Sequence, residues 1–266
     1  MDIAPLLADL QAESSYVDSL VAGLPSSEWS RPTPAAGWTI AHQIGHLTWT
    51  DDAAHLAITD PDAFTARLLS AAEDPAGFVD RGAEESLDEP AQMLTRWRSG
   101  RDRLLADLAA APAGSRIAWY GTAMAPASLA TARLMETWAH GLDVAEALGV
   151  ATPATARLRH IAHLGHRTLG YSFAARGLDQ PTVPVRVELT APDGSLWTFG
   201  PADAADRVDG PALDFCLLVA QRRHRNDLAL HATGPVADTW LDVAQAFAGP
   251  PGSGRPAAAG PSGAEA

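Results

Sequence analysis

Two segments of the sequence each carry a pair of potential metal ligands four residues apart. One pair is His42 and His46, and the other is Glu136 and His140. Residues at positions i and i+4 lie on the same face of a helix, so each pair can direct both of its side chains toward one point. Imidazole nitrogens and a carboxylate oxygen suit zinc or another divalent first-row ion, and three protein ligands leave one position open for water or substrate. These pairs therefore predict one mononuclear metal site.

The surroundings of Glu136 decide between this site and a plainer alternative, in which a solvated Glu136 lies beside a half-buried His140. The neighbours of the pair in the sequence are largely apolar: Leu134, Met135, Trp138 and Leu142. A buried, ionised carboxylate without a partner is costly, which favours the metal site. Asp143, one turn after His140, could accept a hydrogen bond from the second ring nitrogen of a ligand imidazole, or it could cap the helix at the surface.

The ligand pairs must be positioned by helices, because apolar residues recur with the period of a helix through most of the first 150 residues. The pattern predicts a first helix over residues 3–24 and a second that follows Thr39, a suitable N-cap, to about residue 58. A third helix begins at Pro90 and stops before Pro112, and a fourth extends from residue 126 to Gly149. Four long helices without an intervening strand pattern predict an antiparallel four-helix bundle over residues 1–150.

The second half of the chain has a different pattern. A connecting helix is expected within residues 151–180, and apolar and polar residues then alternate from Val183 to Leu189, as in a half-buried strand. The turn residues Asp193 and Gly194 precede a second strand pattern, so a hairpin is expected.

A helix is then expected to begin at residues 209–211 and to continue to residue 225, followed by a strand over residues 228–232 and a closing helix over residues 236–248. Residues 181–248 therefore form a small α+β domain, and the fold class of the chain is α+β. Residues 249–266, mostly Gly, Pro, Ala and Ser, are expected to be a disordered tail.

Composition excludes several classes of function. With 47% hydrophobic and 19% charged residues, the chain has the composition of an ordinary globular protein, and its formal net charge of −13 argues against nucleic acid as a partner. The N-terminus is acidic where a secretion signal would be basic, and no apolar stretch of about 18 residues occurs, so we expect a cytoplasmic protein that does not enter a membrane. Cys216, the single cysteine, is interpreted as a small core residue. Monomer and homodimer both remain open.

Two of these segments resemble a known family. Residues 37–47, GWTIAHQIGHL, and residues 132–149, ARLMETWAHGLDVAEALG, are similar to the two metal-site helices of the DinB-like metalloprotein superfamily. The similarity is to the branch that contains mycothiol-dependent maleylpyruvate isomerase, and within it to actinobacterial metal-binding proteins of unassigned reaction, which also resemble residues 214–225 and 236–252. The resemblance covers residues 1–150 by motif and extends more loosely to the C-terminal domain.

The resemblance implies a particular ligand set and substrate site. The family's three zinc ligands fall on His46, Glu136 and His140, which leaves His42 outside the coordination shell. The family also implies that the arginine ending the helix of residues 212–225, most nearly Arg222, faces the metal cleft, where its guanidinium could hold a substrate carboxylate. Favourable cations at a helix C-terminus are the alternative explanation of this basic segment.

Three further residues are candidates for the wall of a substrate pocket. His163 could line the cleft, although packing between domains would also explain it; with His160 and His166 it forms a row whose step of three residues drifts around a helix, so the three cannot share one ion. Trp119 and Tyr120, just before the fourth helix, could supply aromatic surface to the pocket, or they could simply belong to the core.

The resemblance implies a metal-dependent, and specifically mycothiol-dependent, transferase or isomerase that acts on a small acidic substrate. A divalent ion, most simply zinc, would be the cofactor, and mycothiol the cosubstrate. Two alternatives remain open at this point: a hydrolase in which the metal activates water, and a metal- or ligand-binding protein without turnover. A fourth protein ligand or a sealed cleft would favour the last of these.

Overall fold

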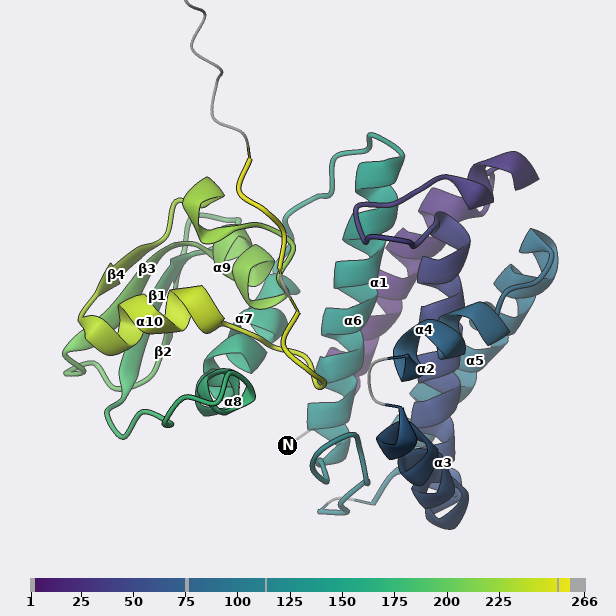
Figure 1. The fold of residues 1–266 in the computed structure, drawn as a ribbon, viewed down its shortest axis with the longest axis horizontal. Coiled ribbons are helices and arrows are strands. Elements are labelled where there is room, and N and C mark those ends of the chain that lie inside the picture. Colours follow the sequence, from purple (N-terminus) through teal and green to yellow (C-terminus); the bar gives the residue numbers. More distant parts are fainter. Residues whose placement is uncertain (1–2, 75–76, 113, 253, 259–266) are drawn as a thin grey trace, which may run out of the picture. The chain divides into compact units, whose positions relative to one another are not determined.

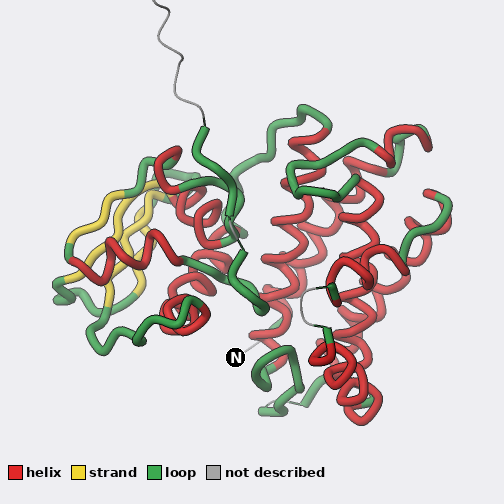
Figure 2. The backbone as a smooth tube through the Cα atoms, in the orientation of Figure 1, coloured by secondary structure: helices red, strands yellow, loops and turns green. Residues whose placement is uncertain are grey.

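The computed structural model describes residues 3–74, 77–112, 114–252 and 254–258 of the 266-residue chain (Figure 1). Its fold class is α+β, as predicted. The chain divides into two compact units, Met1–Pro153 and Ala154–Ala266. The described part of the first unit is helical, and the second unit combines helices with one sheet (Figure 2).

The first unit is the predicted antiparallel four-helix bundle. Its long helices are α1 (Ala4–Val21), α2 (Ile40–Thr59), α5 (Pro90–Ala110) and α6 (Pro126–Ala147). They form because the apolar residues of each helix lie on one stripe and are removed from water together. The buried cluster at one end of the bundle takes residues from all four helices: Val17, Val21, Ile40, Ile44, Leu47, Met93, Leu94, Trp97 and Val144.

Two shorter helices, α3 (Pro61–Glu73) and α4 (Phe78–Glu85), lie in a region where we predicted no element. Apart from Phe64, the side chains of α3 are half-buried or exposed, so the helix has little apolar periodicity to detect. Its signal is local, since the Asp60 side chain accepts a hydrogen bond from the Ala63 N–H and Pro61 occupies the first turn. Helix α4 packs against α2 at Gly82, where a Cβ atom would come within 2.2 Å of the Trp49 ring.

The second unit begins with two helices, α7 (Leu158–Arg167) and α8 (Leu169–Ala175), where the sequence predicted one continuous connecting helix. The break falls at Thr168, whose hydroxyl donates back to the carbonyls of Leu164 and Gly165. Serine and threonine side chains can compete in this way with the backbone hydrogen bonds of a helix. Residue preferences alone do not predict at which serine or threonine the helix breaks.

The sheet has four strands in the order β2-β1-β3-β4. Strands β1 (Val185–Thr190) and β2 (Leu196–Phe199) form the predicted antiparallel hairpin, with Val185, Val187 and Leu189 buried. Strand β3 (Asp206–Pro211) pairs with β1 in parallel and with β4 (His231–Thr233) antiparallel. We did not predict β3, because residues 209–211 have the composition of a helix start; the strand includes them, and α9 follows at once.

Helix α9 spans Ala212–Val219 and ends six residues earlier than predicted. Gln221 has a φ of 55°, and the backbone N–H groups of Gln221 and Arg222 donate to the carbonyls of Leu218 and Leu217. This is a Schellman ending, in which glycine is the usual left-handed residue. With glutamine in that position the sequence gives no stop signal, so Arg222 lies beyond the helix rather than on its last turn. Helix α10 (Pro235–Val243) closes the unit.

Part of the segment predicted as a disordered tail is described. The carbonyl of Gly249 accepts from the Tyr171 hydroxyl at 2.9 Å, and the carbonyl of Gly252 accepts from Arg176 at 2.8 Å. Residues 253 and 259–266 lie outside the described residues. Disorder of this tail stays a prediction.

Cys216 is 0% exposed in α9, and burial raises the pKa of its thiol, which confirms it as a core residue. In the part of the chain that is described, no helix has both the length and the apolar composition needed to cross a bilayer.

Candidate metal centre

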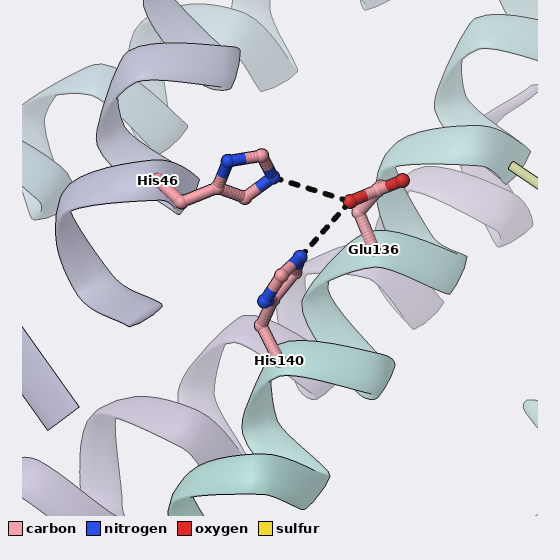
Figure 3. A group of neighbouring side chains, drawn as sticks. All are labelled: His46, Glu136 and His140. Carbon is pink, nitrogen blue, oxygen red and sulfur yellow. Dashed lines mark hydrogen bonds and ion pairs between the residues drawn. The ribbon is translucent and has the colours of Figure 1, made fainter. Parts of the chain in front are cut away.

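His46 of α2 and Glu136 and His140 of α6 converge in the bundle, as the two ligand pairs predict (Figure 3). One potential ligand atom from each residue lies within 4.8 Å of the other two. The Nε2 atoms of His46 and His140 are 3.4 Å and 3.1 Å from the same oxygen, Oε2 of Glu136. Three donors around one point are what a divalent first-row ion needs, with coordination bonds of about 2.0–2.2 Å.

The centre is shielded but reachable. The side chains of His46 and His140 are 7% and 11% exposed, whereas that of Glu136 is 23% exposed. Burial alone would raise the pKa of Glu136, but hydrogen bonds and charge interactions with His140 and His46 outweigh it and hold the pKa well below its ordinary value. Glu136 is therefore an anion at neutral pH, as a metal ligand must be.

A chain of hydrogen bonds fixes the protonation of His140. The Thr33 hydroxyl donates to the carbonyl of Trp38, so the Thr33 oxygen is free to accept from Nε2 of Gln43 at 2.9 Å. Gln43 then presents Oε1, an acceptor, 2.5 Å from Nδ1 of His140. Nδ1 must therefore carry a hydrogen, and Nε2 of neutral His140 has a lone pair.

That lone pair faces Oε2 of Glu136 at 3.1 Å, so two acceptor atoms point at each other unless a cation lies between them. A proton satisfies the contact, and so does a metal ion. Ligand histidines usually have their second ring nitrogen held by an outer hydrogen bond, and Gln43 is placed to give that bond to His140. The residues present therefore fit a divalent ion.

Replacing Gln43 with leucine is expected to weaken metal affinity by about 10–100-fold, the usual cost of losing an outer hydrogen bond to a ligand histidine. Gln43 is fully buried and leucine has a similar volume, so the fold should tolerate the change. Competition titration with a chromogenic chelator measures the affinity. Gln92→Leu, at an exposed position of α5, is the matched control, and equal affinities for the two variants would contradict this role of Gln43.

Trp38 forms one wall of the centre. Its ring stacks on His140 with centroids 5.8 Å apart and lies 5.3 Å from His46, while its indole N–H donates to Asp80 at 2.9 Å. In the sequence, Trp38 stands out only as part of the family motif of residues 37–47. Its contact with both imidazoles could not be derived from spacing, because Trp38 precedes the helix.

His42 does not join the three ligands. Its Nδ1 accepts from the backbone N–H of Thr39 at 3.3 Å and lies 2.8 Å from the Thr39 hydroxyl, so it completes the cap of α2. Among the described residues, the group contains no fourth histidine, cysteine, aspartate or glutamate. Asp143 is buried on α6, but the acceptor at His140 Nδ1 is Gln43 Oε1; a role of Asp143 in orienting a ligand stays a prediction.

Trp119 and Tyr120 belong to an aromatic cluster of the first unit. Trp119 is 8% exposed and its ring is parallel to that of Phe64, which is the packing role named as the alternative. Tyr120 is less buried, and its ring is nearly parallel to that of Trp49 at 6.5 Å. Trp49 in turn lies 6.0 Å from His46, so the cluster extends to the metal centre.

Arg222 and His163 lie in the second unit. Arg222 donates to the carbonyl of Ala220 at 2.8 Å, in the turn after α9. His163 is exposed on α7, with its ring 6.1 Å from that of Phe199, and burial and neighbouring cations lower its pKa. Roles for both residues in substrate binding stay predictions.

Sequence reasoning missed a buried ion pair between the two ligand-bearing helices. Arg133 of α6 donates through two nitrogens to Oδ1 of Asp51 of α2, at 3.1 Å and 2.9 Å. Arg133 precedes Glu136 by three residues, and Asp51 follows His46 by five. The sequence did contain a signal for this ion pair, because Arg133 and Asp51 are oppositely charged residues at interior positions of two adjacent helices.

The helical bundle and the grouping of His46, Glu136 and His140 match the DinB-like, maleylpyruvate isomerase-like branch. Residues 10–145 match the family described as mycothiol maleylpyruvate isomerase N-terminal domain, and residues 181–233 match one described as wyosine base formation. The chain belongs to the mycothiol maleylpyruvate isomerase N-terminal domain family.

Similar proteins and structures agree with this assignment. The chain is 57% identical over 255 residues to an uncharacterized protein of Mycobacterium tuberculosis strain H37Rv, covering 96% of this chain and 99% of the relative, and to its counterpart in strain CDC 1551 / Oshkosh to the same extent. The crystal structure of a mycothiol-dependent maleylpyruvate isomerase matches with a TM-score of 0.55 at 14% identity, over 84% of this chain and 90% of that one. A histidine-to-alanine variant of that enzyme matches with a TM-score of 0.58 at 12% identity, over 86% and 93% of the two chains. At these identities the likeness concerns the fold.

Proposed function

We propose that this protein is a divalent-metal enzyme that uses a thiol cosubstrate, by analogy mycothiol. It would either transfer a thiol to a small acidic substrate or isomerise that substrate. Zinc is the simplest choice of ion. The observation that carries the proposal is the grouping of His46, Glu136 and His140, which supplies three ligands and no fourth among the described residues. A coordination position is then left for a small molecule. A divalent ion held by these three residues would lower the pKa of a bound thiol and so would supply a thiolate nucleophile at neutral pH.

The chain's own residues contribute orientation and charge. Gln43 keeps Nδ1 of His140 protonated and Nε2 directed at the centre. Glu136, the most exposed of the three ligands, keeps its negative charge because the two histidines lower its pKa. Trp38 covers both imidazoles and limits the access of water to them. We further propose that Arg222 and His163 of the second unit contact the substrate and that Asp143 supports the ligands.

The grouping of His46, Glu136 and His140 also bears on the two alternative functions, a metal-binding protein without turnover and a hydrolase. A metal-binding protein without turnover was expected to close its coordination shell with His42 or with a water, and His42 caps α2 instead. A hydrolase would use the same open position for water and is distinguished by its independence of thiol. We also propose a cytoplasmic location, with a small molecule as the partner and neither nucleic acid nor membrane involved.

Mycothiol is expected to raise the melting temperature of the metal-loaded protein, because a ligand that binds only the native state stabilises it. The effect should be absent in His140→Ala, which removes one metal ligand. Metal analysis of both proteins and thermal unfolding with and without mycothiol measure these effects. A full metal complement with no shift by mycothiol would count against the thiol mechanism and favour activation of water.

His55→Ala serves as the control, because His55 contacts Asp107 and is not part of the metal centre. This variant should keep both the metal and the shift.

A further inference from the structure

Trp38 contacts both histidines of the metal centre from outside the two ligand-bearing helices. It lies just before Thr39, the N-cap of α2, and its ring is 5.3 Å from the ring of His46. The ring of His140 on α6 is 5.8 Å away, in a stacked arrangement with an interplanar angle of 20°. One indole therefore packs against ligands from two different helices, so its orientation affects both of them.

The backbone of Trp38 is held locally, but its side chain needs a separate restraint. The Trp38 carbonyl accepts from the N–H and the hydroxyl of Thr33 at 2.8 Å and 2.9 Å, and the Trp38 N–H donates to Ala35 at 3.0 Å. These bonds fix the main chain and leave the choice among side-chain rotamers open. The indole N–H, the one polar group of the ring, donates to Oδ1 of Asp80 at 2.9 Å. This bond selects one orientation of the indole.

Asp80 lies on α4, which packs closely on the part of α2 that carries a metal ligand (Figure 1). At Gly45, directly before His46, a Cβ atom would come within 2.8 Å of the Ala83 carbonyl oxygen. The contact of Gly82 with the following turn of α2 is equally tight. Because glycines let the two helices approach this closely, α4 presents Asp80 from a defined position beside the metal centre.

An ordinary surface hydrogen bond is the alternative explanation, since Asp80 is exposed and Trp38 is half-buried. Such a bond would add a little stability and would not affect the bound ion. The two contacts of the indole with ligand rings favour a larger role. His46 and His140 lie 4.4 Å apart, ring to ring, and both face Trp38. A rotation of Trp38 would therefore loosen the packing of both imidazoles and admit water to them together.

We propose that Asp80 is a positioning residue of the metal centre: it holds Trp38 against the two ligand imidazoles and thereby slows release of the bound ion. The inference rests on the proposed function, because it requires a divalent ion at His46, Glu136 and His140. It adds a residue outside the ligand-bearing helices and gives α4 a role in the centre.

The rate at which the zinc-loaded protein releases its ion to an excess of chelator, followed by stopped-flow absorbance, tests the proposal. Asp80→Ala is expected to release zinc about 5-fold faster than wild type, the factor that corresponds to a hydrogen bond of ordinary strength. Trp38→Phe, which keeps a ring but lacks the N–H donor, should be at least as fast. Asp80→Asn keeps an oxygen acceptor and should restore a rate close to that of wild type.

A double variant separates action through Trp38 from a general effect of the lost carboxyl group. Asp80→Ala combined with Trp38→Phe should release zinc no faster than Trp38→Phe alone, since Asp80 has nothing left to position. Multiplied effects of the two changes would overturn the proposal. Glu85→Ala, at an exposed position of the same helix, is the matched control and should behave like wild type.

A measurement on the metal-free protein does not depend on the ion. The indole N–H resonance of Trp38, assigned by its loss in Trp38→Phe, should exchange with solvent faster in Asp80→Ala than in wild type. Urea unfolding of the two metal-free proteins checks that the fold is retained. Equal exchange, or equal zinc release from Asp80→Ala and wild type, would overturn this inference alone. Failure of wild type to bind zinc would overturn the proposed function and this inference with it.

Discussion

Replacing Arg133 with methionine is expected to lower the free energy of unfolding by about 3–5 kcal/mol, the usual cost of leaving one charge of a buried ion pair without its partner. The side chains of Arg133 and Asp51 are 1% and 7% exposed. Burial raises the pKa of Asp51, and Arg133 only partly offsets this effect. Without the guanidinium, Asp51 must either take up a proton or remain charged inside the bundle.

Urea unfolding of the metal-free protein measures this loss. The double variant Asp51→Leu with Arg133→Met should lose much less than Arg133→Met alone, since apolar residues that replace both charges leave no group unpaired. Arg103→Met breaks an exposed pair with Asp52 and should cost no more than about 1 kcal/mol. A double variant as unstable as the single one would show that a change in side-chain volume, rather than an unpaired charge, causes the loss of stability.

Replacing Glu136 with glutamine is expected to weaken metal affinity by more than about 100-fold. The loss of an outer hydrogen bond to a ligand costs at most about 100-fold, and this change removes a ligand's charge. The change keeps the shape of the side chain but removes the negative charge that lies 3.4 Å and 3.1 Å from the two imidazoles. An amide would present either a neutral oxygen or an N–H group to the same atoms. Activity that depends on the metal should be lost with it.

Metal analysis after dialysis, together with the thermal unfolding of the metal-free forms, measures this effect. The metal-free variant should remain folded, because an amide can still hydrogen-bond to the imidazoles. Glu84→Gln, on the exposed face of α4, is the matched control and should retain the metal of the wild type. A Glu136→Gln variant with full metal occupancy would exclude Glu136 as a ligand.

The bundle and the pairing of Glu136 with His140 were predictable because both follow from short periods in the sequence. Apolar residues at helical spacing mark α1, α2, α5 and α6, and a separation of four residues places Glu136 and His140 on one face. The choice of His46 over His42 came from the family resemblance. The structure gives its physical basis, since His42 is engaged at the N-cap of α2.

The elements that were wrong or missing depend on contacts that no short period encodes. Helix α9 ends in a left-handed Gln221 where the sequence has no glycine, and α7 ends where Thr168 bonds back to its own helix. Strand β3 is defined by its pairing with β1 and β4 rather than by its composition. In each case tertiary context overrides local preference.

The same limit applies to the metal centre. Gln43, Trp38 and Asp80 owe their contacts to the positions of neighbouring helices and loops, and none belongs to a spacing pattern. Gln43 lies three residues before His46, a position that points along the same helix face, and this was the one signal available from the sequence.

The burial of Cys216 has a practical consequence for enzymology. Its sulfur is inaccessible and its thiol resists ionisation, so the native chain should be unreactive toward reagents that titrate free sulfhydryl groups. Any sulfhydryl that disappears during turnover must then come from the added cosubstrate. Consumption of an added thiol can be followed by titrating the sulfhydryl groups of samples withdrawn during turnover, without a correction for the enzyme.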